Sequence, residues 1–216
     1  MNVIPLFASN LIETFVDPST YDKQTIIDTV KENYKLDPNR NPWDKSCDFH
    51  NYHNDWDNPN FKNIGSLLEP LKSIYDSVLN DYLSSVANNY EFESQIVNIT
   101  AFGSNQHMSV HSHYSHSVTH GMVHYISIPK DSSSITFWNP ISVAQYPNVE
   151  EFNNFSEVTD KTIIHNSNFF EYYDLQPLED YLYIFPSYLK HSVPKSKNSD
   201  VRIAVIINVK VRKKHE

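Results

Sequence analysis

The sequence predicts an α+β protein that is mainly β: a jelly roll or antiparallel sandwich supported by N-terminal helices. Two observations predict this class. An apolar stripe at helical spacing ends near residue 86, and after residue 90 short runs rich in Ile, Val, Tyr, Phe and Thr follow one another between turn residues. No helical pattern separates these runs, which favours antiparallel pairing. A chain of 216 residues is expected to form a single domain over 1–216, with a helical layer over 1–90 and a β core over 91–216.

The first 90 residues contain one strand-like opening and two helical patterns. Residues 3–7 predict a short edge strand, and residues 17–20 supply cap chemistry for a helix over 21–34. Residues 37–62 are rich in Asn, Asp and Pro and indicate a long ordered loop. Apolar residues then recur at three- and four-residue steps, which predicts a helix over 62–86 that lies against a sheet.

The rest of the chain reads as strands joined by turns. Only three glycines are present, so Asn, Asp, Ser and Pro have to form most of these turns. The expected strands are 94–102, 121–129, 133–138, 161–166, 180–185, 189–193 and 200–211.

The composition limits the cellular compartment and the binding partners that we expect for this protein. The formal charge of −9, from 26 acids and 17 bases, argues against a nucleic-acid partner, which would require a basic stripe. One cysteine, Cys47, allows no intrachain disulfide and indicates a reducing compartment. The N-terminus lacks the pattern of a secretory signal, and the longest apolar run, Ile203–Ile207, is too short to cross a bilayer. We therefore expect a cytoplasmic protein with no membrane partner.

Histidines are concentrated in one stretch. Six of the 11 fall between residues 107 and 124, namely His107, His111, His113, His116, His120 and His124. In a strand, residues two apart project from the same face, so His111 and His113 could reach one metal ion, although this spacing alone is a weak signal. His124 neighbours a predicted core strand, so it could be a buried structural histidine as readily as a residue near the metal site.

A third histidine and an arginine follow downstream. His191 comes just after an apolar strand and a Pro-Ser turn, and Arg202 begins the run Val201-Arg-Ile-Ala-Val-Ile-Ile-Asn208. In that strand Ile203, Val205, Ile207 and Val209 share one face, and Arg202, Ala204, Ile206 and Asn208 share the other. Both faces are apolar in the middle, so both should be covered. A buried guanidinium needs an anion, which could be a ligand carboxylate or one of the 26 acids of the chain.

Four blocks of this sequence resemble a family of 2-oxoglutarate- and Fe(II)-dependent oxygenases. Gln106 to Pro129 is similar to its Q…H-x-H…S-G-V-Y-Y-L-x-x-P block, and Ser134-Ile-Thr-Phe-Trp-Asn-Pro140 to its next strand and turn. Phe185-Pro-Ser-Tyr-Leu-Lys-His191-Ser-Val-Pro194 is similar to its F-P-S-x-L-x-H-x-V-x-P block. Arg202-Ile-Ala-Val-Ile-Ile-Asn208 resembles its R-I-S-I-A-F-N strand. The resemblance covers about residues 95–208 in order and spacing.

The resemblance implies a double-stranded β-helix that holds Fe(II) and uses 2-oxoglutarate as co-substrate. His111, His113 and His191 would be the metal ligands and Arg202 would bind the far carboxylate of 2-oxoglutarate. Asn98 and Tyr125 would line the co-substrate pocket. The implied reaction is hydroxylation of a C–H bond with release of succinate and CO2.

The sequence departs from the common pattern in three places. The usual site has two histidines and one carboxylate, whereas His113 makes this ligand set all imidazole, as in the family's own motif. Ala204 stands where a serine usually follows the arginine by two, and the stretch between His111 and Gly121 is one residue longer, with His120 in place of a serine. The loop change bears on the choice of substrate.

Two other classes of function fit the same residues. One is a cupin-like three-histidine dioxygenase or isomerase that does not use 2-oxoglutarate, and the other is a non-catalytic jelly-roll binding module with a structural Zn(II). Only the 2-oxoglutarate hypothesis requires the cation of Arg202. A zinc hydrolase is less favoured because no carboxylate lies near His111 or His191 in the sequence to act as general base. The expected substrate is a small molecule or a protein or peptide side chain, and no pattern indicates an oligomeric state.

Overall fold

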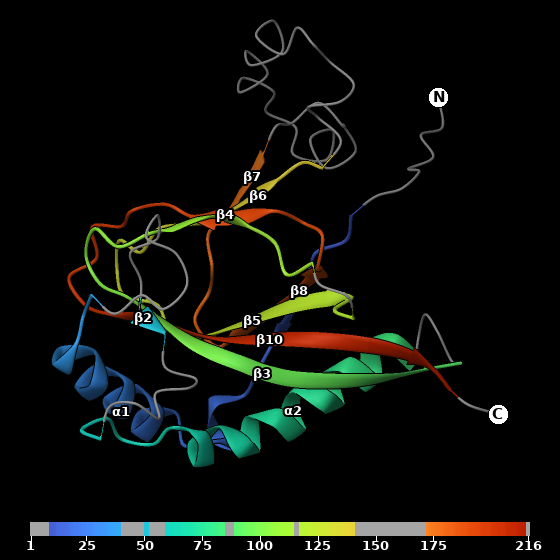
Figure 1. The fold of residues 1–216 in the computed structure, drawn as a ribbon, viewed down its shortest axis with the longest axis horizontal. Helices are drawn as coiled ribbons and strands as arrows, with labels where there is room; N and C mark the ends of the chain where they lie inside the picture. The colour runs from blue at the N-terminus through green and yellow to red at the C-terminus, as the bar shows by residue number, and fades with distance from the viewer. Residues whose placement is uncertain are drawn as a thin grey trace, which may run out of the picture.

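The described part of the protein forms two antiparallel β-sheets packed face to face, with two helices on the outer face of the larger sheet (Figure 1). This computed structural model describes residues 9–39, 50–51, 59–84, 89–114, 117–140 and 172–214. The prediction of a mainly β protein with supporting helices is confirmed. The division of the chain at residue 90 stays a prediction.

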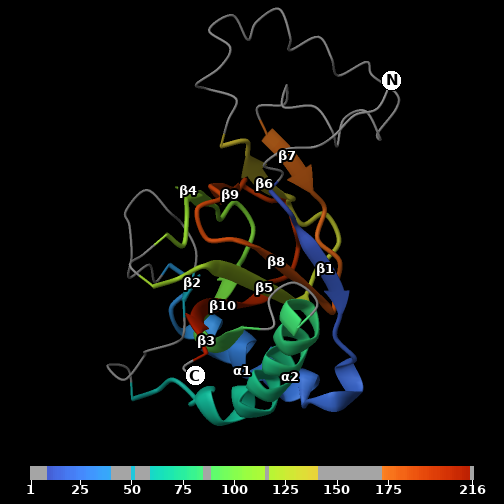
Figure 2. The ribbon, with the colours of Figure 1, turned by 90° about the vertical axis from the view of Figure 1, so that its right-hand side faces the viewer.

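The larger sheet has six strands in the order β1-β8-β5-β10-β3-β2. In this order the strands are Ile12–Phe15, Tyr181–Pro186, His120–Ser127, Arg202–Lys213, Tyr90–Phe102 and His50–Asn51. Strand β10 is central: it pairs with β3 along its whole length and with β5 on its other side. Figure 2 shows β1 beside β8 at the far edge of this sheet.

The smaller sheet has four strands in the order β4-β9-β6-β7. They are Met108–His111, His191–Val193, Ile135–Trp138 and Tyr172–Leu175. This sheet faces the concave side of the larger one, and together they form the two walls of the roll (Figure 2).

Two helices cover the opposite face of the larger sheet. Helix α1 spans Lys23–Leu36 and helix α2 spans Gly65–Ser84, and both lie below β3 and β10 in Figure 1. The apolar stripe that predicts α2 is the face in contact with the sheet, since Leu71 and Tyr75 are fully buried. Burying a side chain of this size stabilises the fold by about 1.5–3 kcal/mol.

Alternation along each strand divides the interior into two regions. On β10, Ile203, Val205, Ile207 and Val209 belong to the cluster between the sheet and the helices. The next residue of the opposite set, Ala204, belongs to the cluster between the two sheets. The prediction that both faces of this strand are covered is therefore confirmed, and the face that begins with Arg202 points into the roll.

Six of the predicted strands are present with boundaries shifted by a few residues: β3, β5, β6, β8, β9 and β10. The predicted strands over 3–7 and 161–166 lie outside the described residues, as do Cys47 and most of the loop over 37–62. Strands β1, β2, β4 and β7 have two to four residues each and were not predicted.

The predicted cap of the first helix is wrong in one respect. Asp17 caps a separate 3-10 turn, Pro18–Thr20, by accepting a hydrogen bond from the Ser19 amide. Helix α1 instead begins after Asp22, whose carboxylate accepts from the Thr25 amide. Two aspartates therefore satisfy two successive sets of free amides.

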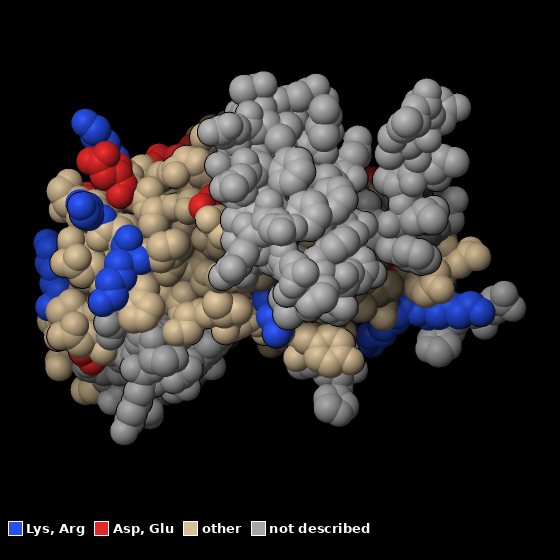
Figure 3. All heavy atoms as spheres, turned by 90° about the horizontal axis from the view of Figure 1, so that it is seen from above, with Lys and Arg blue, Asp and Glu red and all other residues tan. Residues whose placement is uncertain are grey.

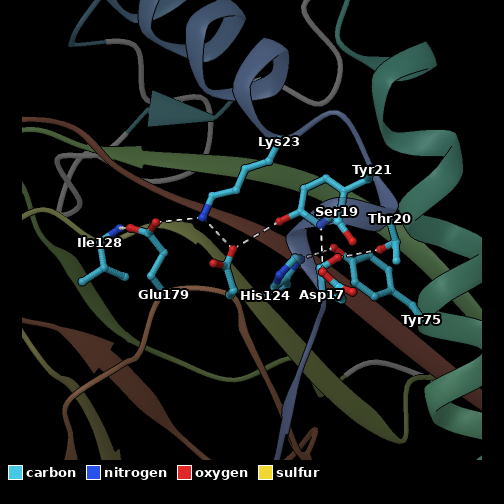
Figure 4. Close-up of polar contacts among 10 residues, drawn as sticks. Asp17, Ser19, Thr20, Tyr21, Lys23, Tyr75, His124, Ile128 and Glu179 are labelled. Atoms are coloured by element: carbon cyan, nitrogen blue, oxygen red, sulfur yellow. Dashed lines mark hydrogen bonds and ion pairs between the residues drawn. The ribbon is translucent and has the colours of Figure 1, made fainter.

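A polar cluster joins both helices to the sheet (Figure 4). His124 on β5 is fully buried, and its Nδ1 lies 2.9 Å from the hydroxyl of Tyr75 on α2. Burial, and then the charge of Lys23, lowers the pKa of His124 to about 3. Lys23 at the start of α1 donates to Glu179 and Asp180, each at 2.7 Å, and so ties this helix to the turn before β8. His124 is therefore a buried structural histidine, which is one of the interpretations that the sequence allows.

No helix in the described part of the chain is long and apolar enough to cross a membrane.

We expect acid to destabilise the protein in part through His124. Its pKa is about 3 in the folded state and 6.5 when unfolded, so the unfolded state binds more protons between these values. The free energy of unfolding should therefore fall as pH drops below 6.5, by up to about 1.4 kcal/mol per pH unit for this one group. The free energy of unfolding, measured with urea at several pH values between about 7 and 5, should fall less steeply with falling pH in His124→Gln than in the wild type. Equal slopes for the two proteins would contradict this assignment.

Candidate metal centre

Three histidines meet between the two sheets. His111 ends β4 and His191 begins β9, and the two are direct partners across these antiparallel strands. His113 follows two residues after His111. The ring centroid of His191 lies 4.2 Å from that of His111 and 5.1 Å from that of His113. One ring nitrogen from each residue lies within 4.8 Å of the other two, so the three could hold one metal ion.

The other nitrogen of each ring is held by an oxygen acceptor. His111 Nδ1 donates to the Ser109 carbonyl at 2.9 Å, and His191 Nδ1 donates to the Leu189 carbonyl at 3.0 Å. His113 Nδ1 lies 2.9 Å from the side-chain oxygen of Asn208. A carbonyl oxygen can only accept, so Nδ1 carries the proton and Nε2 keeps its lone pair. Each of the three imidazoles could therefore bind a metal through Nε2.

The rings are also kept neutral. Burial lowers the pKa of His111, and lowers that of His191 well below its usual range, where the two neighbouring imidazoles add to the effect. Burial lowers the pKa of His113 to about 4. A neutral imidazole is the form that binds a metal, so protons compete weakly with a cation here at neutral pH.

Aromatic side chains surround the cluster. Phe185 on β8 lies edge-on to His191, with ring centroids 4.9 Å apart, and Phe137 on β6 lies 5.7 Å from the same ring. These two rings contact each other at 5.1 Å. They form a dry wall behind the histidines, which strengthens any charge interaction inside.

A cavity extends from the histidines along the inner face of the larger sheet. Its described lining contains no carboxylate. The lining residues are Asn98, Thr100, Phe102, Met108, His111, His113, Val123, Tyr125, Ile135, His191, Val193, Arg202, Ala204 and Ile206.

Arg202 places a positive charge in this cavity. It is 2% exposed, and it donates to the Ser133 carbonyl at 2.8 Å and to the Tyr125 hydroxyl at 3.1 Å. Its Nε has no partner among the described residues, and no described carboxylate pairs with it. The hypothesis that an acid of this chain pairs with Arg202 therefore finds no support in the described part of the molecule. A buried guanidinium without an anion is unfavourable, so the site is suited to an anionic ligand.

Asn98 adds a second set of free polar atoms. It is 1% exposed, it lies opposite Ile206 on β10, and its side-chain oxygen and nitrogen have no hydrogen-bond partner among the described residues. Buried amides normally have partners, so such an amide at a cavity wall points to a ligand. A cation held by imidazoles together with a dicarboxylate would fit these donor groups.

The six residues predicted as the site all line this one cavity: Asn98, His111, His113, Tyr125, His191 and Arg202. One detail differs. Strand β4 ends at His111, so His113 does not lie on the same strand and reaches the cluster from the following loop, where its amide donates to the Ser187 carbonyl. The sequence argument did not identify Asn208 as a partner of His113. Its position on the same strand face as Arg202 is the signal that could have done so.

A family model described as "Putative 2OG-Fe(II) oxygenase" matches residues 98–208, which include all of these residues. The chain belongs to this family. It is therefore an Fe(II)- and 2-oxoglutarate-dependent oxygenase, and the family assignment predicted from the four sequence blocks is confirmed. A search of the curated proteins finds no match.

Solved structures show the same fold. A Pseudomonas putida prolyl-4-hydroxylase has a TM-score of 0.54 at 10% identity, over 94% of this chain and 93% of that one. A Trichoplax adhaerens prolyl hydroxylase, in complex with a peptide fragment of hypoxia inducible factor, has a TM-score of 0.57 at 14% identity, over 94% and 83%. HygX from Streptomyces hygroscopicus, with nickel and 2-oxoglutarate bound, has a TM-score of 0.50 at 12% identity, over 94% and 83%. The predicted jelly roll, or double-stranded β-helix, is thus confirmed.

We expect the Tyr125 hydroxyl to matter for stability as well as for the site. Tyr125→Phe would remove the acceptor of one Arg202 N–H and leave a charged donor buried without a partner. The free energy of unfolding should fall by about 1–3 kcal/mol. The matched control is Tyr188→Phe, at a residue that is 48% exposed, where a change within about 0.5 kcal/mol is expected. Urea unfolding measures both, and equal effects would contradict the role of the Tyr125 hydroxyl.

Proposed function

We propose that this oxygenase binds Fe(II) through Nε2 of His111, His113 and His191 and binds 2-oxoglutarate through Arg202, Asn98 and Tyr125. In this proposal it hydroxylates a C–H bond of a small molecule or of a peptide side chain. The observation that carries the proposal is one cavity whose lining includes three imidazoles and a buried arginine without a carboxylate partner among the described residues.

The donor set suits an octahedral cation with open positions. Three ligands on one face of the metal leave room for a bidentate co-substrate and for oxygen. The three imidazoles are neutral, so they add no charge to Fe(II), and the negative charge must come from the co-substrate. This differs from the usual set of two histidines and one carboxylate, and it makes binding of a dianionic co-substrate more favourable electrostatically.

The remaining groups suit a dicarboxylate. In this proposal Arg202 binds the carboxylate far from the metal through two charge-assisted hydrogen bonds, a geometry that its planar guanidinium favours. The Tyr125 hydroxyl, which contacts Arg202 at 3.1 Å, holds the guanidinium in place. The unpartnered amide of Asn98 supplies a donor and an acceptor on the neighbouring strand. Ala204 offers no hydroxyl at the position where the family has a serine, so this grip depends more heavily on Arg202.

When bound, Fe(II) and 2-oxoglutarate supply the oxidising chemistry: 2-oxoglutarate, O2 and R–H yield succinate, CO2 and R–OH. The protein itself has three tasks. The histidines fix the metal, Arg202 fixes the co-substrate, and the apolar walls exclude water from the reacting atoms. No proton has to be removed by a side chain, which agrees with a described lining that contains no carboxylate.

The class of substrate is proposed on broader grounds. The Trichoplax adhaerens prolyl hydroxylase of the same fold was solved with a peptide, so a peptide side chain is an accessible substrate for this architecture. A small molecule is the other class of substrate that we propose. On the face drawn in Figure 3, described acidic and basic side chains lie near one another at one end, and further basic side chains lie at the other end.

An anaerobic titration with 2-oxoglutarate tests the proposal. The Fe(II)-loaded protein should develop the weak visible charge-transfer band of a keto acid bound to the metal. Arg202→Met should need about 100-fold more 2-oxoglutarate, because a charged hydrogen-bonded pair contributes about 3 kcal/mol. Succinate formation under air should be reduced in parallel at limiting 2-oxoglutarate.

The matched control is Arg212→Met. Arg212 is exposed at the end of the same strand, where it pairs with Glu93, so its loss should leave the titration unchanged. Stoichiometric iron with no band at saturating 2-oxoglutarate would overturn the co-substrate assignment and favour a cupin-like dioxygenase. Binding of Zn(II) alone, with no Fe(II), would favour the structural-metal alternative.

A further inference from the structure

His113 lies over a row of three residues that are direct partners across three neighbouring strands. Asn208 on β10 is the partner of Gly121 on β5, and Gly121 is the partner of Phe185 on β8. All three point to the inner face of the larger sheet, where the histidine cluster lies. The row therefore forms a cradle beneath the ring of His113, which comes from the opposite side of the roll.

Asn208 provides the polar end of this cradle. Its side-chain oxygen lies 2.9 Å from His113 Nδ1. The other two histidines are held differently, because each donates to a backbone carbonyl two residues earlier in its own segment. Those bonds follow from the local path of the chain. Only His113, of the three, depends on a side chain from a distant strand for its orientation.

Gly121 leaves room for the ring of His113. A Cβ at this position would lie 2.8 Å from Cε2 of Phe185, which is closer than packed atoms allow, and 3.0 Å from His113 Nδ1, so that the imidazole would have to shift by a few tenths of an ångström. The ring of Phe185 meets His113 edge-on, with centroids 5.8 Å apart. The imidazole of His113 thus lies over the backbone of Gly121, next to the ring of Phe185 and the side-chain oxygen of Asn208.

We propose that Asn208 is a positioning residue for the metal site: its side-chain oxygen fixes His113 as the Nδ1–H tautomer and turns Nε2 toward the metal, while Gly121 leaves room for the ring. This inference rests on the proposed function, in which His113 binds the metal. It also explains how the fold accommodates an imidazole at a position where related sites have a carboxylate. A carboxylate needs neither a partner for Nδ1–H nor space for a ring.

The neutrality of Asn208 is part of the arrangement. An amide oxygen fixes the tautomer without adding charge, whereas a carboxylate at 208 would make the imidazole more basic and a stronger ligand. Asn208→Asp keeps the acceptor and Asn208→Leu removes it in a side chain of similar size. The two variants therefore separate the hydrogen bond from the packing.

Proton NMR of the Co(II)-loaded protein reports on each ligand. In the wild type we expect three strongly shifted, solvent-exchangeable N–H signals, one for each Nε2-bound imidazole. Asn208→Leu should lose the slowly exchanging signal of His113 and bind Co(II) about 10–100-fold more weakly. Asn208→Asp should keep all three signals and bind at least as tightly as the wild type.

Two further variants complete the design. Lys210→Leu makes a comparable polar-to-leucine change two residues along the same strand and should leave both the signals and the Co(II) affinity unchanged. Gly121→Ala should displace His113 and lower the Co(II) affinity through a separate contact, so the cradle is tested even if Asn208→Leu does not fold.

The outcomes distinguish two failures. A wild-type protein that shows fewer than three exchangeable signals, or binds no Co(II), would overturn the proposed metal site. Three signals in the wild type and the same three, at equal affinity, in Asn208→Leu would overturn only the role of Asn208. An Asn208→Asp variant as weak as Asn208→Leu would do the same, since the acceptor would then have no effect.

Discussion

The strict alternation of side chains along β10 is the constraint on which the rest of the structure depends. Because this strand is central and covered on both faces, each residue must serve either the helix-side core or the roll interior. Ile203, Val205, Ile207 and Val209 anchor the sheet to the helices. The intervening positions carry Arg202 and Asn208, which hold the two ends of the site. A shift of one residue in register would bury the arginine among the helices and expose the core to the metal site.

The site itself is assembled from groups that work against stability. His191, the guanidinium of Arg202 and the free amide of Asn98 are buried, and the imidazoles of His111 and His113 are partly buried. Each would be more stable with its own partner, and a ligand supplies those partners. The surrounding aromatic rings and the well-packed helix side of the sheet offset this cost. In the proposed function, a cation and a dicarboxylate bind here because they give these groups the partners that the fold itself does not supply.

Much of this architecture could be predicted from the sequence, and the rest could not for physical reasons. The period of 3.6 in the second helix and the alternation of the longer strands are strong local signals of secondary structure. The sequence blocks that contain His111, His191 and Arg202 indicate the family. The four short strands are held by pairing with distant partners, so their own residues reveal little. The same is true of the cradle: the neighbours of Gly121 are decided by strand register, which a single sequence does not reveal.

The most direct test of the account is a crystal structure of the anaerobic protein with Fe(II) and 2-oxoglutarate, with the metal located by its anomalous scattering. The account predicts one iron bound by Nε2 of His111, His113 and His191, and one 2-oxoglutarate whose far carboxylate meets the guanidinium of Arg202. Iron at another site, iron bound by fewer than three of these imidazoles, or a co-substrate that does not contact Arg202 would contradict it.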